Sequence, residues 1–138
     1  MLEVCFVCTG DTCRSVMAER IARKMAKDMG VRCKFSSAGL EAKRENISDN
    51  ARLTLKKLGY DYSNRTSVQL KERPNVVYVC VTGSHKQFVE SARVISFKSL
   101  AGEVIDPYGK DLETYEQCAH LIEDNVKVLL EKIKRLGG

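Results

Sequence analysis

The sequence predicts an α/β protein in which strands and helices alternate and the strands form one parallel sheet. Three segments carry this prediction: an apolar start at residues 1–7, a β-branched run at residues 75–81, and an amphipathic segment at residues 113–136. The chain has 138 residues, which is within the size range of a single domain. We therefore expect one domain spanning residues 1–138.

The first half of the chain predicts two strands and two helices. Residues 1–7 are mostly apolar and are expected to form a buried strand. A helix should run from Ser15, a good N-cap residue, to about Gly30, because glycine commonly ends helices. A second strand is expected over residues 32–37. A second helix, capped by Asp49-Asn50, should run through residues 58–59.

The second half continues the alternation. Residues 75–81 are β-branched and almost uncharged, which is typical of a strand buried on both faces of a parallel sheet. A short helix over 84–91 and a fourth strand over 93–97 should follow. Glycine and proline indicate a loop over 99–112, and apolar residues at helical spacing predict a last helix over 113–136.

This order of elements implies right-handed crossovers, with helices on both faces of a four-stranded sheet. Active sites in such folds lie at the carboxyl ends of the strands. The loop after the first strand contains Cys8, and the loop after the fourth strand contains Asp106. We therefore expect these two loops to share one edge of the sheet.

Composition and charge narrow the functional classes. The net charge is +5, but basic residues are interleaved with acidic ones, so an anionic substrate explains the excess without nucleic-acid binding. No apolar run is long enough to span a membrane, and the apolar start lacks the basic residues and length of a secretion signal. We expect a cytoplasmic protein whose six cysteines are mostly reduced thiols, with neither nucleic acid nor membrane as a partner.

The segment between the first strand and the first helix carries the chemistry. It reads Cys-Thr-Gly-Asp-Thr-Cys-Arg-Ser over residues 8–15. Backbone N–H groups at a helix N-terminus form an anion site. Gly10 permits a tight backbone, Arg14 can pair with two phosphate oxygens, and Ser15 can donate a hydrogen bond to a nearby sulfur or oxygen. The helix dipole and Arg14 favour the thiolate of Cys8, a nucleophile that needs no separate base.

These residues resemble the motif of the low-molecular-weight protein tyrosine phosphatase family, over residues 7–15 and the following 17–19. Further matches lie at residues 37–39, 82–87 and 106–109, so the resemblance covers nearly the whole chain. It implies a three-layer, flavodoxin-like fold. It also implies hydrolysis of phosphomonoesters through a phosphocysteine, without metal or cofactor, on phosphorylated protein substrates.

The resemblance also implies roles for individual residues. Cys8 is the nucleophile, Arg14 binds the phosphoryl group, and Asp106 acts first as general acid and then as general base. Tyr108 should line the cleft, where its aromatic face suits a phenyl ring or a guanidinium. The loop residues expected to contact phosphate are Thr9, Gly10, Asp11, Thr12, Cys13 and Ser15. On oxidation, Cys13 can form a disulfide with Cys8; its alternative role is that of a buried structural thiol.

Two positions depart from the family pattern. Asp11 stands where the family usually has Asn, whose amide braces the loop through neighbouring serines. A carboxylate loses the amide donors and repels phosphate, so either it carries a proton or activity is reduced. The family often has His near Arg65 as part of the same brace, and its absence weakens the match there.

Thr12 bears on the choice of substrate. Tyrosine phosphatases of the family usually carry Ile or Leu at this position, whereas its bacterial protein arginine phosphatases carry Thr. A smaller polar residue leaves room for a guanidinium, with which Asp106 would pair. Both phosphoarginine and phosphotyrosine remain candidates.

Two other functional classes stay open. A thiol-dependent arsenate reductase of the same fold would need a relay cysteine, and Cys80 lies near the place where one could sit. A non-catalytic phosphate-binding module would result if Asp11 disables the loop. We expect no metal site, because Cys5 and Cys8 lie on a strand and His85 and His120 are isolated histidines.

Overall fold

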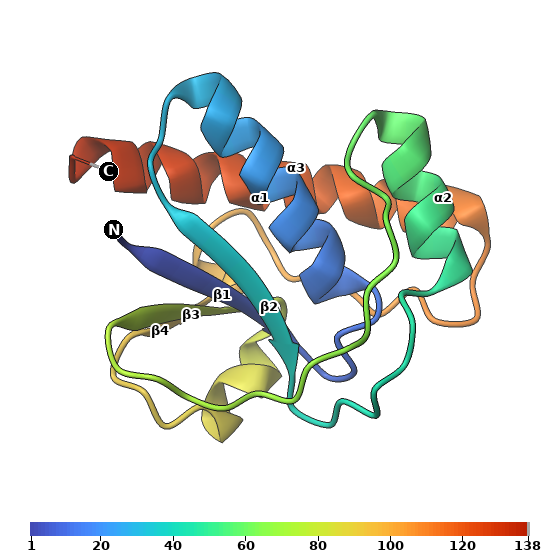
Figure 1. Cartoon of the computed structure of the whole chain (residues 1–138), viewed down its shortest axis with the longest axis horizontal. Helices are drawn as coiled ribbons and strands as arrows, with labels where there is room; N and C mark the ends of the chain where they lie inside the picture. Colours follow the sequence, from blue (N-terminus) through green and yellow to red (C-terminus); the bar gives the residue numbers. More distant parts are fainter. Residues whose placement is uncertain (138) are drawn as a thin grey trace.

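The computed structural model describes residues 1–137 as a four-stranded parallel sheet with helices packed against it (Figure 1). Along the sheet the strands lie in the order β2-β1-β3-β4, so the strand that leads into Cys8 is central. In chain order the elements are β1 (Glu3–Cys8), α1 (Arg14–Met29), β2 (Lys34–Gly39), α2 (Asp49–Leu58), β3 (Val76–Cys80), the 3₁₀ helix η1 (Gly83–Phe88), β4 (Val94–Ser96), the 3₁₀ helix η2 (Phe97–Ser99) and α3 (Leu112–Arg135). The predicted four-stranded parallel sheet is confirmed.

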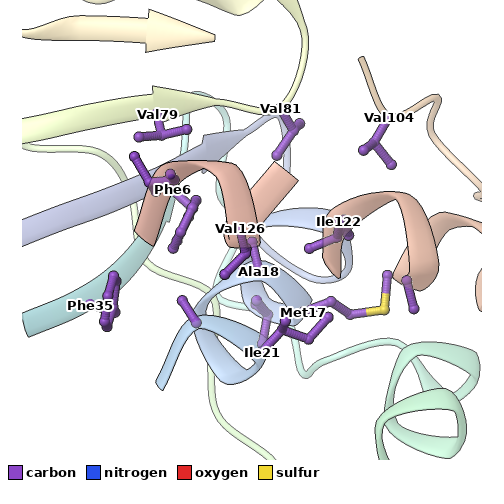
Figure 2. Close-up of a cluster of buried hydrophobic side chains, with 14 of the residues drawn as sticks. Phe6, Met17, Ala18, Ile21, Phe35, Val79, Val81, Val104, Ile122 and Val126 are labelled. Atoms are coloured by element: carbon purple, nitrogen blue, oxygen red, sulfur yellow. The ribbon is translucent and has the colours of Figure 1, made fainter. Parts of the chain in front are cut away.

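The main hydrophobic core lies between one face of the sheet and the α-helices. Alternate side chains of a strand point to opposite faces, and Phe6 of β1 therefore faces α1 and α3 (Figure 2). Its ring packs at 6.2 Å, centroid to centroid, from both Phe35 and Phe97. Met17 of α1 and Ile122 of α3 are fully buried in the same cluster. This packing fixes the position of α1, whose N-terminus borders the loop over residues 8–15, the expected phosphate loop.

The opposite face of the sheet has a thinner cover. Cys5 and Val7 of β1 point to this side, where they join Tyr78, Cys80 and Val89 in a smaller cluster. In place of an α-helix, the short helix η1 and irregular chain segments pack here (Figure 1). Helices thus cover both faces, as predicted, but the two layers differ strongly in thickness.

Some element boundaries differ from those expected. The second strand runs to Gly39 rather than ending at residue 37, because it pairs with β1 in parallel until Gly39 lies opposite Cys8. The helix expected over 84–91 is a shorter 3₁₀ helix that ends at Phe88. Ser48, not Asp49 or Asn50, caps α2 by accepting a hydrogen bond from the N–H of Ala51.

The start of α1 also differs from the expected one. The helix begins at Arg14 with Cys13 as its N-cap, so Ser15 lies inside the first turn instead of capping it. The side chain of Ser15 is buried and turned toward Cys8. Its hydroxyl is thereby free of a capping role and available to the site.

Candidate active site

The carboxyl ends of the strands border a cavity of about 360 Å³. The two loops expected to share this edge both line it, because Cys8 and Asp106 face the same space. The side chains and backbone that line the cavity belong to Cys8, Thr9, Gly10, Asp11, Thr12, Cys13, Arg14, Glu41, Lys43, Glu45, Ser48, Asp106, Tyr108 and Tyr115. Every predicted substrate-contacting residue except Ser15 is in this lining, and Ser15 lies directly behind the sulfur of Cys8.

Cys8 sits at the base of the cavity, at the end of β1. Its Sγ lies 2.9 Å from Oγ of Ser15 and accepts a hydrogen bond from the N–H of Asp11 at 3.3 Å. The side chain of Cys13 makes no capping hydrogen bond, which leaves the first N–H groups of α1 for an anion. The buried sulfur therefore lies at the N-terminal end of α1, within hydrogen-bond distance of the Asp11 N–H and the Ser15 hydroxyl.

Arg14 connects the phosphate loop to the loop that carries Asp106. The guanidinium is almost fully buried, and its Nη1 donates a hydrogen bond to the carbonyl oxygen of Val104 at 3.1 Å. Its Nη2 lies 3.8 Å from Oδ2 of Asp106, whose side chain is half exposed. The Val104 contact orients the guanidinium, while the long, open contact with Asp106 leaves that carboxyl able to meet a substrate.

Asp11 occupies the sharp turn of the loop and is held by three donors. Its φ of 56° is in the left-handed region, which Asp and Asn tolerate better than most residues. Oδ1 accepts from the Ser15 hydroxyl at 2.7 Å, and Oδ2 accepts from the Val68 N–H at 2.9 Å and from Nη2 of Arg65 at 2.6 Å. The same Arg65 nitrogen also donates to Oγ of Ser37.

Arg65 has a place in the brace of the loop. We expected the absence of His near Arg65 to weaken the match to the family there, and the structure shows that the guanidinium of Arg65 itself contacts Ser37 and balances the charge of Asp11. Sequence reasoning treated the two departures separately and missed that they are paired. The opposite charges of Asp11 and Arg65 were the one feature of the sequence that could have indicated this pairing.

The loop packs closely against the end of β2. A Cβ atom at Gly39 would lie 2.7 Å from the carbonyl oxygen of Thr9 and 3.0 Å from the backbone nitrogen of Asp11, so only glycine fits there. Gly10, by contrast, has no positive φ, and a Cβ there would meet only Oγ1 of Thr12 at 3.8 Å. The tight backbone that we expected at Gly10 is therefore at Asp11, and the glycine that permits the close approach is Gly39.

His85 supports the loop from the thinly covered face. Its ring is buried, with Nε2 at 3.0 Å from Oγ1 of Thr9 and Nδ1 at 3.2 Å from Oγ1 of Thr82. Burial lowers the pKa of His85, and the nearby Arg14 lowers it further. A neutral ring bridges the two threonines by donating from one nitrogen and accepting at the other. The contact with Nε2 of His85 thus positions the side chain of Thr9.

The remaining cysteines are poorly suited to ionise. Burial, followed by the neighbouring Cys8, raises the pKa of Cys13 well above its ordinary value. Burial raises the pKa of Cys80 to about 12, and its fully buried side chain faces the smaller core cluster rather than the cavity. Within residues 1–137, no group of three or more His, Cys, Asp or Glu side chains is placed to hold a metal ion. None of the helices described combines the length and the apolar character needed to cross a membrane.

The mouth of the cavity contains residues that sequence reasoning did not identify. Glu41, Lys43 and Glu45 line it from the irregular segment between β2 and α2, where no periodic pattern points to their positions. Tyr108, an expected cleft residue, stands at the rim with 84% of its surface exposed. The mouth is thus rich in charge and open to a side chain from a protein substrate.

Comparisons with known proteins agree with this geometry. The family model described as low molecular weight phosphotyrosine protein phosphatase matches residues 3–137. A protein-arginine-phosphatase from Bacillus subtilis is 28% identical over 97% of this chain and 98% of its own length. The low molecular weight protein-tyrosine-phosphatase PtpB from Staphylococcus aureus is 30% identical, over 94% of this chain and 96% of its own.

Solved structures of phosphatases are also similar to this chain over nearly its whole length. A mutant of YwlE from Bacillus subtilis superposes with a TM-score of 0.90 at 27% identity, covering 97% of this chain and 99% of that one. The low molecular weight protein tyrosine phosphatase from T. tengcongensis gives a TM-score of 0.88 at 33% identity, over 96% and 99%. The fold and site define a phosphatase built on a single cysteine loop. The chain belongs to the low molecular weight phosphotyrosine protein phosphatase family and is a hydrolase of that family.

The close approach at Gly39 generates a first prediction. Gly39→Ala will displace the backbone of Thr9 and Asp11, at an overpacking cost of about 1–3 kcal/mol. We expect the affinity for inorganic phosphate, measured by titration calorimetry, to fall about tenfold. Lys34→Ala, at the exposed far end of the same strand, is the control and should bind phosphate as the unchanged protein does. Equal affinity in Gly39→Ala would show that the contact does not shape the loop.

His85 generates a prediction for pH. Its pKa in the folded protein lies below the unfolded value of about 6.5, so the unfolded chain takes up the proton first as pH falls. The folded state therefore loses stability as pH drops below about 6.5. Urea unfolding at about pH 7.5 and about pH 5.5 should show a smaller acid loss in His85→Gln.

His120 is the matched control for this measurement. Glu123 raises its pKa, so its contribution to stability is present at low pH and is lost as pH rises through the folded pKa. His120→Gln should therefore change the acid loss in the opposite direction. The free energy of unfolding of His85→Gln and of the unchanged protein could instead change by the same amount between the two pH values. In that case His85 is not held neutral by bridging Thr82 and Thr9.

Proposed function

We propose that this chain is a cysteine-dependent protein phosphatase that works through a phosphocysteine, and that phosphoarginine in proteins is its substrate. One observation carries the mechanism: the buried sulfur of Cys8, which accepts a hydrogen bond from the Asp11 N–H, faces the same cavity as Arg14 and the half-exposed Asp106. This is the arrangement that a nucleophile, an anion clamp and a proton donor need.

The first chemical step transfers the phosphoryl group to sulfur. A lone pair on Sγ of Cys8 forms the S–P bond while the bond from phosphorus to the leaving nitrogen or oxygen breaks. Asp106 gives its proton to that leaving atom. Arg14 and the loop N–H groups stabilise the charge on the three remaining phosphoryl oxygens.

The second step regenerates the thiolate. Asp106, now a carboxylate, accepts a proton from a water molecule that attacks phosphorus, and the S–P bond breaks with its electron pair returning to Cys8. Inorganic phosphate is left in the loop until it dissociates. A structure of a YwlE arginine phosphatase cysteine-to-serine mutant with a phosphorylated active-site serine, 27% identical and with a TM-score of 0.90, supports this intermediate.

The mouth of the cavity supports phosphoarginine as the substrate. The carboxylates of Glu41, Glu45 and Asp106 line the cavity together with Lys43, and carboxylates attract and orient a guanidinium. Tyr108 offers an aromatic face for the same cation. Thr12 is small and polar at a position where a bulkier side chain would favour an aryl group. Two of the relatives, from Bacillus subtilis and Geobacillus stearothermophilus, are named protein-arginine-phosphatases.

The other two classes find less support. A reductase relay through Cys80 would need this side chain to reach Cys8, yet it is fully buried in the smaller core cluster and does not line the cavity. A disabled loop was suspected because of Asp11, but Arg65 balances that charge. We place the reaction in the cytoplasm, because a catalytic thiolate persists best in a reducing compartment.

The substrate is tested by comparing phosphate release from a phosphoarginine peptide and a phosphotyrosine peptide, with Cys8→Ser as the blank. We expect phosphoarginine to have the higher kcat/KM and Thr12→Ile to reduce that preference. Asp106→Asn should lower kcat by about 10²–10⁴-fold, as removal of a general acid does. A preference for phosphotyrosine would reject the substrate but keep the mechanism. Absence of Cys8-dependent turnover would reject both.

We also propose Cys13 as a protective partner of Cys8 during oxidation. Peroxide converts the Cys8 thiolate to a sulfenic acid, and the neighbouring Cys13 thiol then displaces water to form a disulfide. The raised pKa of Cys13 keeps it protonated while Cys8 reacts first. The disulfide spares Cys8 from irreversible oxidation.

Recovery after oxidation tests this role. After a brief exposure to hydrogen peroxide, dithiothreitol should restore most phosphatase activity to the unchanged protein and much less to Cys13→Ser. Peptide mass spectrometry should find the Cys8–Cys13 link in the oxidised sample only. Equal recovery in Cys13→Ser would exclude the protective role.

A further inference from the structure

We propose that a groove beside the active site binds a basic segment of the protein substrate, next to the residue that carries the phosphate. The groove has a volume of about 510 Å³ and lies between the segment after β2, the segment before β3 and the 3₁₀ helix η1. This inference rests on the proposed function only in taking a phosphorylated protein as the substrate. It applies to phosphoarginine and phosphotyrosine alike, because the groove contacts neighbouring side chains and not the phosphate.

The groove is continuous with the catalytic cavity. Thr9 and Glu41 line both spaces. The N–H of Glu41 donates to the carbonyl oxygen of Thr9 at 2.8 Å, and the N–H of Leu40 donates to that of Cys8 at 3.0 Å, so the wall between the two spaces is attached to the phosphate loop. An extended polypeptide advances by only about 3.3 Å per residue. Residues close to the phosphorylated one can therefore reach the groove.

The walls of the groove are held by hydrogen bonds within the protein. The side-chain amide of Gln69 donates to the carbonyl oxygen of Leu40 at 2.8 Å and accepts from the N–H of Ala42 at 2.9 Å. The two carboxylate oxygens of Glu72 accept from the backbone N–H groups of residues 90–91, at 2.9 and 2.7 Å. These contacts join the segments that form the groove. The groove is thus formed before a ligand binds, which lowers the cost of ordering it.

The groove is negatively charged. Glu41, Glu72 and Glu90 line it, and among the residues that the structure describes no lysine or arginine does. Within residues 1–137 none of these three carboxylates takes part in an ion pair. His85 also lines the groove, but burial lowers its pKa, so its ring adds no positive charge at neutral pH. The chain as a whole carries a net charge of +5, so the groove is a local exception that attracts a cation.

The apolar part of the groove favours the side chain of a lysine or arginine. Leu40 and Leu70 are partly buried and pack against the smaller core cluster, and both line the groove. Phe88 of η1 lies beside them with 63% of its surface exposed. Lysine and arginine place their methylene groups on apolar surface while the charged end stays near carboxylates, and an aromatic face attracts the same charge. A basic residue therefore matches both properties of the groove, whereas an acidic segment would be repelled.

The inference is tested by phosphate release from peptides that differ in one residue. Each peptide carries the phosphorylated residue that the protein hydrolyses faster, with a single lysine, glutamine or glutamate placed at successive positions on either side. At the position that reaches the groove, lysine should lower KM by about twofold to fivefold relative to glutamine, as an exposed ion pair does, with kcat unchanged. Glutamate there should raise KM. Added sodium chloride should reduce both differences.

Variants of the groove locate the effect. Glu90 is exposed and does not line the catalytic cavity, and the glutamine peptide serves as each variant's own reference. Glu90→Gln should remove most of the preference for lysine, Glu90→Lys should turn it into a preference for glutamate, and Phe88→Ala should reduce it by about twofold. Glu131→Lys makes the same change of charge at an exposed position of α3 and is the matched control. An unchanged lysine preference in Glu90→Lys, or an equal loss in Glu131→Lys, would overturn the proposal.

A binding measurement separates this inference from the proposed function. In amide NMR spectra of Cys8→Ser, a lysine-containing peptide without phosphate should shift the signals of Gln69 and Phe88, and the added change Glu90→Lys should abolish these shifts. If the protein hydrolyses neither phosphopeptide, the proposed function fails, and the shifts still decide whether the groove binds a basic segment. Their absence would overturn the inference. Shifts without any effect of lysine on KM would assign the groove to another partner and overturn its role in substrate binding.

Discussion

The whole site depends on one turn of the backbone, at Asp11. The chain must leave β1 and enter α1 within a few residues while its N–H groups face inward, and the left-handed φ of 56° at Asp11 makes this possible. A non-glycine residue in that conformation needs support from its surroundings. Arg65, Ser15 and the Val68 N–H supply it, and Gly39 leaves space for the loop beside β2. Cys8 and Arg14 have their positions only because this turn is held.

Features set by local patterns could be predicted from the sequence. A buried apolar strand, a loop with a nucleophile and an arginine, and a following helix form one continuous segment over residues 3–29, so their relative placement follows from local geometry. The edge shared by Cys8 and Asp106 follows from the parallel strand order. The fold class and the cavity that unites these residues were therefore within reach of the sequence alone.

Features set by tertiary contacts could not be predicted in the same way. Arg65 lies 54 residues beyond Asp11 in an irregular segment, and nothing in the local pattern indicates that the two meet. The role of Gly39 depends on how closely the loop over residues 9–11 approaches the end of β2, whereas the sequence alone suggests Gly10 as the position of the tight backbone. Glu41 and Glu45 reach the cavity from a loop without periodicity.

The unequal cover of the two sheet faces has a consequence for the motions of the molecule. The α-helical side contains the larger core, whereas η1 lies over a small cluster and carries Phe88 with 63% of its surface exposed. Segments with few buried contacts open at a lower free energy than the global unfolding reaction. Because His85 of η1 holds Thr9, a local opening of this layer reaches the phosphate loop while the main core stays folded. The thin layer at η1 is therefore the part of the fold through which local fluctuations would reach the site first.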